Sequence, residues 1–249
     1  MKLSGNTVFI TGGTSGIGRS LAEALHKRGN QVIISGRRKG HLAEVTKANP
    51  GMQSLELNVE DPASIAAVAK KLIAEYPKLN VLINNAGIMQ IDDAAGAIDD
   101  SVLVSIVTTN LLGPIRMTSA LIEHLKKQPS ATVINVSSGL AFVPLASTAV
   151  YSATKAAIHS YTQSMRYRLK GSSVRVLELI PPWVQTDLLN SKDEPRAMPL
   201  AAFIEEAVTV LGTDAEEVLV ERVKMLRNNP GPNEFVFVAQ FNDMIASAH

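Results

Sequence analysis

The sequence predicts an α/β protein with one doubly wound parallel sheet and helices on both faces, three layers in a single domain over residues 1–249. Two observations predict this class. Short runs of β-branched and apolar residues alternate with longer stretches whose apolar residues recur at helical spacing. The short runs are almost continuously apolar, as in strands buried on both faces, and their alternation with helices produces right-handed βαβ units. The expected strands are residues 7–11, 31–35, 52–57, 81–84, 132–137 and 174–180.

The composition fits one folded domain and excludes several classes of protein. Apolar residues make up 46% and charged residues 19% of the chain, a balance opposite to that of disordered proteins. The net charge of +1 comes without a basic stretch interleaved with aromatic residues, so no nucleic acid partner is expected. With no cysteine there is no disulfide framework. The polar N-terminal segment does not resemble a signal peptide and no apolar run reaches about 18 residues, so we expect a cytoplasmic protein without a membrane anchor.

A glycine-rich segment directly follows the first expected strand. Residues 11–18 read TGGTSGIG and lead into an amphipathic helix. Glycines permit a tight turn and let backbone amides approach a pyrophosphate, which the free N–H groups of a helix start also attract. This pattern predicts a Rossmann-like dinucleotide site. A P-loop is rejected because Arg19 stands where lysine is needed, and the strands end in Asn84 and Ser137 rather than in the aspartate that holds magnesium.

The second expected strand ends in basic residues. An acid near this point would hold the ribose diol of NAD, whereas a base accommodates the extra phosphate of NADP. No acid is present, Gly36 leaves room, and Arg37 offers a planar fork for a phosphate dianion. Arg38, Ser15 or Arg19 are candidate helpers. We therefore predict NADP(H) in preference to NAD(H), the alternative being a solvated basic loop before a helix.

A tyrosine and a lysine four residues apart form a candidate acid/base pair. On a helix Tyr151 and Lys155 share one face, so the ammonium can lie close to the phenol oxygen. A free tyrosine has a pKa of about 10, and an adjacent positive charge would draw that pKa toward neutrality. Ser138 adds a hydroxyl that can bind the same substrate oxygen. For this pair alone, a core tyrosine beside a solvated lysine stem is the alternative.

Further motifs complete a set. NNAG at residues 84–87, Asn110 and PPWVQT at residues 181–186 join TGGTSGIG, Ser138 and YSATK at residues 151–155. In order and spacing this set resembles the classical short-chain dehydrogenase/reductase family. EYPKLNVLINNAG and PPWVQTDL make the chain similar to the branch named for the oxidoreductase of the D-alanyl lipoteichoic acid operon. The resemblance implies an oxidoreductase that transfers a hydride between nicotinamide and a carbonyl or alcohol substrate.

The resemblance also implies roles for individual residues. Tyr151 would be the general acid toward the carbonyl oxygen, and Lys155 would lower its pKa and hold the nicotinamide ribose. Ser138 would orient the substrate oxygen, and Asn110 would anchor a water that connects Lys155 to solvent. Besides Tyr151 and Lys155, the expected cofactor-binding residues are Gly12, Thr14, Ser15, Gly16, Ile17, Gly18, Arg37, Arg38, Asn58, Val59, Asn84, Ala86, Gly87, Pro181, Val184 and Thr186.

The chain departs from the family pattern at two points. Asn58 stands where an acid usually meets the adenine amine, and its amide oxygen can accept the same hydrogen bond. Pro181 and Pro182 replace the usual Pro-Gly and put Trp183 near the nicotinamide pocket. The residues expected to line the substrate pocket are mostly apolar, which favours a hydrophobic or mixed carbonyl substrate. They are Met89, Leu140, Phe142 and Trp183.

The last quarter of the chain is less regular. Residues 187–211 form either a substrate lid or a surface loop, with a helix over residues 201–211. Thr213 and Glu216 resemble a capping box that would start a helix ending near residue 228. In the tail, residues 229–249, a strand at 235–238 competes with the helical spacing of other apolar residues. That spacing involves Phe237, Phe241, Met244, Ile245 and Ala248.

Assembly, metal content and catalysis complete the expectations. In the resembled family, helices equivalent to residues 110–126 and 151–169 pair across a dimer, which implies a homodimer or homotetramer. From the sequence alone, the protein's own sheet can equally cover these helices.

The histidines show no ligand spacing, so no metal is expected. They are His26, His41, His124, His159 and His249. A non-catalytic NADP-binding sensor on the same fold is the alternative function, and the joint presence of Asn110, Ser138, Tyr151 and Lys155 argues against it.

Overall fold

The parallel sheet predicted from the sequence forms the centre of the computed structural model, which describes residues 1–247. Within those residues seven strands are ordered β3-β2-β1-β4-β5-β6-β7. Their bounds are β1 (Thr7–Ile10), β2 (Gln31–Gly36), β3 (Gln53–Glu56), β4 (Leu79–Asn84), β5 (Ala131–Val136), β6 (Val174–Ile180) and β7 (Glu217–Leu219). The order reverses between β1 and β4, so the doubly wound fold is confirmed and a ligand-binding crevice is expected beyond the carboxyl ends of these strands.

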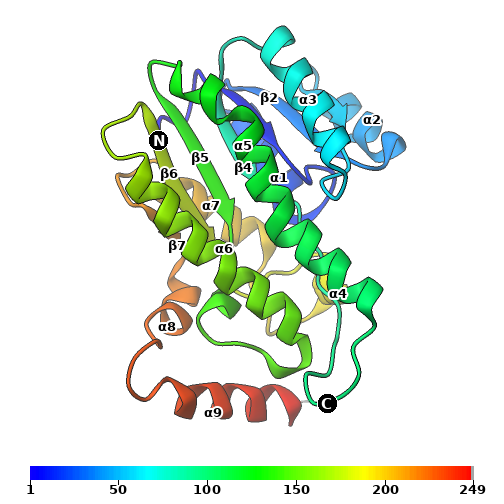
Figure 1. Ribbon diagram of the computed structural model, residues 1–249, viewed down its shortest axis with the longest axis vertical. Coiled ribbons are helices and arrows are strands. Elements are labelled where there is room, and N and C mark those ends of the chain that lie inside the picture. Colours follow the sequence, from blue (N-terminus) through cyan, green and yellow to red (C-terminus); the bar gives the residue numbers. More distant parts are fainter. Residues whose placement is uncertain (248–249) are drawn as a thin grey trace.

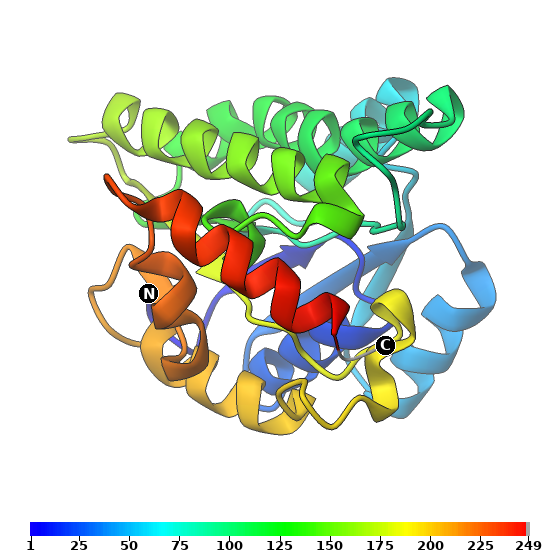
Figure 2. The same cartoon turned by 90° about the horizontal axis from the view of Figure 1, so that it is seen from below.

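Helices cover both faces of the sheet (Figures 1 and 2). Residues alternate sides along each strand, so in β1 Val8 and Ile10 enter one core and Phe9 enters the other. On the first side lie α1 (Gly16–His26), α2 (Lys39–Ala48) and α7 (Leu200–Leu211). On the second side lie α3 (Pro62–Glu75), α5 (Gly113–Lys126) and α6 (Ala149–Arg168), with α4 (Asp100–Val107) and a π-helical turn (Thr108–Leu112) before α5.

The helix expected from the capping box near residue 213 is wrong. Thr213 Oγ1 accepts a hydrogen bond from the Ala215 amide, and the chain then extends into β7. Val218 pairs with Leu179 of β6 and is fully buried, so the open sheet edge outweighs the local helix signal. A short 3-10 turn (Glu221–Val223) and α8 (Lys224–Arg227) follow. β7 is thus the seventh strand of the sheet, and it precedes the tail.

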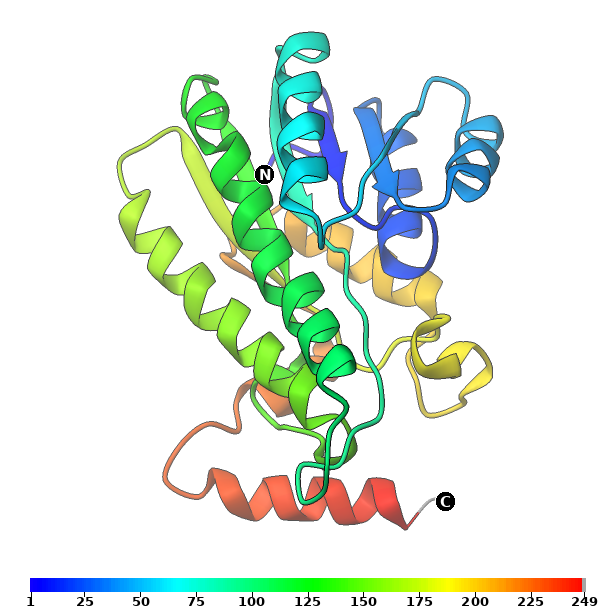
Figure 3. The same ribbon diagram turned by 45° about the vertical axis from the view of Figure 1, so that its right-hand side comes forward.

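The tail forms a helix, α9 (Glu234–Ala246), so the strand alternative at residues 235–238 is wrong. Figure 3 shows α9 below the rest of the fold, and Figure 2, seen from that side, shows it crossing in front of the carboxyl end of the sheet. Asn242 fixes it there, since its side chain accepts a hydrogen bond from the Ala146 amide and donates one to the Pro144 carbonyl. Ala248 and His249 lie outside the described residues. Among the helices within residues 1–247, none combines the length and apolarity needed to span a bilayer.

Candidate active site

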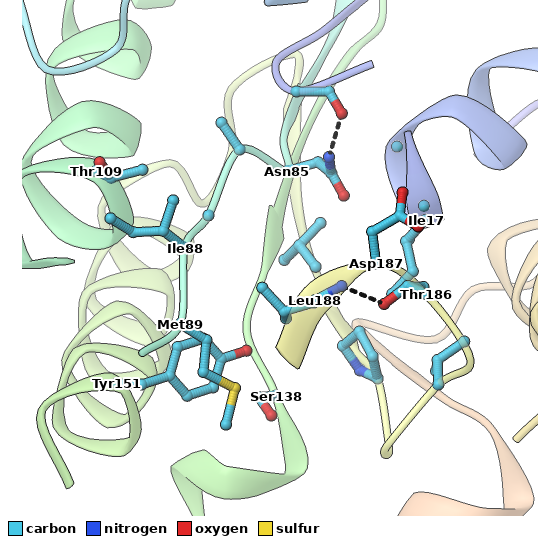
Figure 4. Close-up of a pocket in the computed structure, with 18 of the residues that line it drawn as sticks. Ile17, Asn85, Ile88, Met89, Thr109, Ser138, Tyr151, Thr186, Asp187 and Leu188 are labelled. Carbon is cyan, nitrogen blue, oxygen red and sulfur yellow. Dashed lines mark hydrogen bonds between the residues drawn. The ribbon is translucent and has the colours of Figure 1, made fainter. Parts of the chain in front are cut away.

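A cavity of about 740 Å³ opens at the carboxyl ends of the strands. The loops that follow the strands from β1 to β6 supply its walls, and the helices α6, α8 and α9 contribute side chains to it. This is where a doubly wound sheet is expected to bind a ligand. One end is formed by the glycine-rich loop after β1, and Ser138 and Tyr151 lie together farther along the cavity (Figure 4).

The glycine-rich loop packs closely on the loop after β4. Gly12 has a φ of 69°, and a Cβ there would lie 2.8 Å from the Ala86 Cα. A Cβ on Gly18 would overlap the Gly12 carbonyl and the side chain of Asn85. Asn85 Nδ2 donates to the carbonyls of Thr11 and Gly12, each at 3.0 Å. Only glycine fits at these two positions, and the first turn of α1, which has no side-chain cap from Ser15, keeps its amides available to an anion.

Arg37 and Arg38 stand at the end of β2, at the edge of the cavity. The Arg37 side chain is 63% exposed, and its Nη1 lies 3.9 Å from Glu60 Oε1. The same Glu60 oxygen accepts hydrogen bonds from Ser105 and Thr109. The arginine fork is therefore loosely held and accessible from the cavity, and Glu60 is an acid on this wall that the sequence interpretation did not identify.

The side chains of Ser138, Tyr151 and Lys155 meet on the cavity wall. Tyr151 projects from α6 with its hydroxyl directed toward Ser138 (Figure 4). Lys155 Nζ donates to the Val136 carbonyl at 2.9 Å and lies 5.4 Å from the centre of the Tyr151 ring. The loop after β4 approaches this group at Gly87, where a Cβ would lie in ordinary van der Waals contact with Lys155 Nζ, at 3.7 Å.

Burial controls the protonation of this pair. It raises the pKa of Tyr151 to about 12, an effect that the hydrogen bond with Ser138 partly offsets. Burial also lowers the pKa of Lys155 to about 8, against the opposing influence of the Glu178 charge. Desolvation outweighs the lowering of the tyrosine pKa that was expected from Lys155, because Nζ is directed at the Val136 carbonyl. At neutral pH the phenol is protonated and can act as an acid.

Most residues expected from the sequence line this one cavity. Three of the expected site residues do not, and the candidate helper Arg19 also lies outside the lining and pairs with Glu23 and Glu44. Asn84 is buried between Thr118 and Asn135, because the last residue of β4 points into the sheet face and Asn85 turns toward the cavity in its place. Asn110 lies behind the wall and binds the backbone of Ile88 through both ends of its amide.

Phe142 is the third of these residues. It packs away from the cavity, against His159 and beneath the guanidinium of Arg227. The expected residues that do line the cavity are Gly12, Thr14, Ser15, Gly16, Ile17, Gly18, Arg37, Arg38, Asn58, Val59, Ala86, Gly87, Met89, Ser138, Leu140, Tyr151, Lys155, Pro181, Trp183, Val184 and Thr186.

Several lining residues were missed by the sequence interpretation. Phe241 and Ile245 reach the cavity from α9, and Leu226 reaches it from α8. The helical spacing of apolar residues in the tail was the signal for α9, but nothing local showed that this helix crosses the cavity mouth. Leu188 and Leu189 also line the cavity, in a turn where Leu189 has a φ of 49°.

The fold gathers one group of side chains with the geometry of metal ligands, which the spacing of the histidines did not indicate. Within residues 1–247, donor atoms of His159, Glu178 and Glu217 lie within 4.8 Å of one another. Arg227 already binds both oxygens of Glu217, at 2.7 and 3.0 Å. A guanidinium therefore supplies the positive charge, and we assign no metal to this group.

Comparison with known proteins identifies relatives over nearly the whole chain. Residues 6–197 match the family model described as short chain dehydrogenase. The chain is 39% identical to the oxidoreductase DltE of Bacillus subtilis, covering 92% of this chain and 93% of that protein. It is 30% identical to the 3-oxoacyl-[acyl-carrier-protein] reductase FabG of Escherichia coli, covering 81% and 83%.

Solved structures agree with these matches. A short chain dehydrogenase from Burkholderia cenocepacia, crystallised with NADP, has a TM-score of 0.85 at 26% identity and covers 96% of this chain and 98% of its own. A 3-ketoacyl-(acyl-carrier-protein) reductase from Brucella melitensis, crystallised with NADH, has a TM-score of 0.78 at 27% identity and covers 86% and 93%.

Proposed function

The chain belongs to the short-chain dehydrogenase family, and from that membership we propose that it is an NADP-dependent oxidoreductase that interconverts a carbonyl compound and its alcohol. The observation that carries this proposal is the meeting of Ser138, Tyr151 and Lys155 in the cavity that begins at the glycine-rich loop. A hydroxyl pair and an ammonium at one wall suit proton transfer to a bound carbonyl oxygen.

The cavity fits a dinucleotide. Close packing at Gly12 and Gly18 leaves a side-chain-free cradle beside the uncapped start of α1, which is the environment that a pyrophosphate requires. Asn58, Val59 and Ala86 line the same part of the cavity and would flank the adenosine. Pro181, Val184 and Thr186 line the part formed after β6 and would hold the nicotinamide side.

In the proposed reaction, reduced NADP supplies the hydride and the protein supplies position and a proton. The protonated phenol of Tyr151 donates its proton to the substrate oxygen, and the Ser138 hydroxyl hydrogen-bonds to that oxygen and orients it. Lys155 lies beside the Tyr151 ring and stabilises the phenolate that forms. Asn110 holds the loop at Ile88 in place beneath this group.

The preference for NADP rests on Arg37. Related structures were solved with NADP in one case and with NADH in another, so family membership alone does not decide it. The accessible Arg37 guanidinium suits the 2′-phosphate, and Arg38 stands next to it on the cavity wall. The 2′-phosphate of NADP would gain a charge-assisted contact with Arg37, and NAD has no phosphate at this position to make it.

Titration of the purified protein with NADPH and NADH tests this preference. We expect tighter binding of NADPH, a loss of roughly tenfold or more in NADPH affinity for Arg37→Ala, and little change for NADH. The control is Arg28→Ala, which removes an exposed arginine whose side chain donates to the Ala24 carbonyl of α1. Tighter binding of NADH by the unaltered protein would contradict the role of Arg37.

The proposed substrate is a carbonyl compound with an apolar arm. Leu140, Leu145 and Met89 line the cavity with Tyr151, and Leu226, Phe241 and Ile245 extend the apolar wall toward α9. An aldehyde, ketone or quinone could place its oxygen at Tyr151 and its hydrocarbon part against this wall.

We further propose that residues 187–199 act as the substrate lid. Leu188 and Leu189 line the cavity from this segment, and Leu189 and Asn190 both have positive φ, a conformation that a small rearrangement would relieve. The rest of the expected lid is α7, whose Phe203 and Ala207 are fully buried against the sheet, so movement is assigned to the first part.

The proposal includes location in the cytoplasm and assembly as a homodimer or homotetramer that pairs through α5 and α6.

A non-catalytic NADP sensor is not favoured, because a sensor needs no buried Ser138, Tyr151 and Lys155 beside the nicotinamide end of the cavity. Turnover that depends on Tyr151 separates the two functions, since a sensor would bind NADPH and show no turnover.

A further inference from the structure

A row of polar side chains crosses the sheet beneath α5 and α6. Asn84 pairs in register with Asn135, Asn135 with Glu178, and Glu178 with Glu217, so four neighbouring strands place a polar residue at the same level. Residues in register on parallel strands point to the same face. The surrounding core is apolar, and buried polar groups there are unfavourable unless they are satisfied.

The two asparagines are tied into hydrogen bonds. Asn84 Nδ2 donates to Asn135 Oδ1 at 2.9 Å, and Asn135 Nδ2 donates to Thr162 Oγ1 at 2.9 Å. Glu178 differs. It is fully buried, its Oε2 lies 2.8 Å from His159 Nδ1, and its Oε1 has no hydrogen-bond partner among the described residues. A carboxylate in this position requires nearby positive charge.

The charged groups that surround Glu178 come from three elements. From α6, Lys155 and His159 follow Tyr151 at four-residue spacing and thus lie along one face of the helix. From β7 comes Glu217, and from α8 comes Arg227, which binds Glu217 through both its oxygens. Besides the His159 ring, the two carboxylates are thus accompanied by the permanent cation Arg227 and by Lys155, whose charge depends on pH and which is the cation nearest to the reacting groups.

Phe142 packs against two of these charged or titratable groups, His159 and Arg227. Its ring lies 4.7 Å from the His159 ring, edge to face, and 4.7 Å from the Arg227 guanidinium. This explains why Phe142 leaves the cavity wall. Glu178 itself is fully buried, and exclusion of water lengthens the reach of its charge toward Lys155.

We propose that Glu178 is a positioning residue for the acid/base pair: its buried charge, held by His159, keeps Lys155 protonated beside Tyr151. This inference rests on the proposed function. It assigns the carboxylate no contact with substrate or cofactor, and it makes Arg227 the opposing influence. A buried lysine with no such carboxylate loses its proton more readily, and the charge that stabilises the Tyr151 phenolate is then lost.

The pKa of Lys155 responds to Glu178 in the direction that this role requires. Burial lowers the pKa of Lys155 to about 8, and the Glu178 charge acts against this lowering. An opposite charge close to a buried group typically shifts the pKa of that group by about one unit or more. Removal of the Glu178 charge therefore lowers the apparent pKa of the coupled Tyr151 and Lys155 pair.

The test is the pH profile of NADPH-dependent carbonyl reduction by the full-length Glu178→Gln variant, which keeps the size of the side chain. Reduction requires the protonated pair and falls at high pH, so we expect this fall to begin roughly one pH unit lower than in the unaltered protein. Arg227→Gln removes a positive charge from the same network and should move the fall to higher pH. The matched control is Glu216→Gln, a carboxylate that is 63% exposed on the neighbouring strand end and should leave the profile unchanged.

Opposite shifts in the two variants are a signature that a purely structural role would not give. A Glu178→Gln profile that superimposes on that of the unaltered protein, or shifts of the same sign in both variants, overturns the inference. The failure of the proposed function looks different, because the unaltered protein then shows no Tyr151-dependent turnover.

Unfolding by denaturant between pH 7 and 10 gives a readout that needs no turnover. Stability should rise as the buried Lys155 loses its proton, and this rise should begin about one pH unit lower in Glu178→Gln. An unshifted rise contradicts the inference even if the variant is inactive.

Discussion

Replacement of Lys155 by methionine should stabilise the fold at neutral pH. Burial lowers the lysine pKa from 10.5 to about 8, so its charged form destabilises the native state by about 3 kcal/mol at pH 7. The variant also loses the hydrogen bond from Nζ to the Val136 carbonyl, worth about 1 kcal/mol. Methionine fills similar space without a charge. The net expectation for Lys155→Met is a gain of about 2 kcal/mol at pH 7.

The sign of the pH dependence is part of this prediction. Because the folded pKa is lowered, the unfolded state binds more protons between pH 8 and 10.5, and the stability of the unaltered protein rises with pH over that window. The advantage of Lys155→Met should therefore shrink above pH 8 and vanish near pH 10. Denaturant unfolding followed by Trp183 fluorescence at pH 7 and pH 10 measures it, with the exposed Lys70→Met as control. A variant less stable than the unaltered protein at pH 7, or an advantage that does not change with pH, would refute the reasoning.

Two further predictions concern the cofactor cradle and the C-terminal helix. Gly12→Ala should weaken NADPH binding at least about tenfold, because its φ of 69° and its 2.8 Å approach to Ala86 exclude a Cβ. Gly40→Ala, where a Cβ meets open space, should bind normally, and equal affinities for the two variants would count against the cradle. Asn242→Ala frees α9 from the loop at residues 144–146 and should raise KM for apolar carbonyl substrates several-fold while kcat falls less. Asn233→Ala, whose side chain caps no helix, is the control, and an unchanged KM would remove α9 from the substrate site.

The sheet could be predicted from the sequence because its strands carry the signal locally. A run rich in β-branched residues, such as residues 132–137, favours a strand covered on both faces. The short β7 has no such signal: it spans three residues, begins with Glu217 and follows a segment that resembles a capping box. Its conformation is decided by pairing with β6, which is a tertiary effect.

The candidate site shows the same division. Glycines and motif residues after strand ends could be assigned to one cavity, because parallel strands bring their carboxyl ends together. The sequence did not show whether Asn84 or Asn85 faces the cavity. Successive residues point to opposite sides, so an error of one residue in the end of β4 exchanges the two asparagines. The pKa of Tyr151 depended on burial and on the direction of the Lys155 side chain, neither of which is present in the spacing of the two residues.

The most direct test of the central claim is NADPH oxidation by the purified protein with a panel of aldehydes, ketones and quinones, for the unaltered chain and for Tyr151→Phe. The exposed Tyr167→Phe serves as control. We predict turnover with at least one apolar carbonyl compound, a loss of at least about 100-fold in kcat for Tyr151→Phe, and NADPH binding that persists in this variant. Turnover that survives Tyr151→Phe would contradict the assignment of Tyr151 as the acid and with it the proposed mechanism.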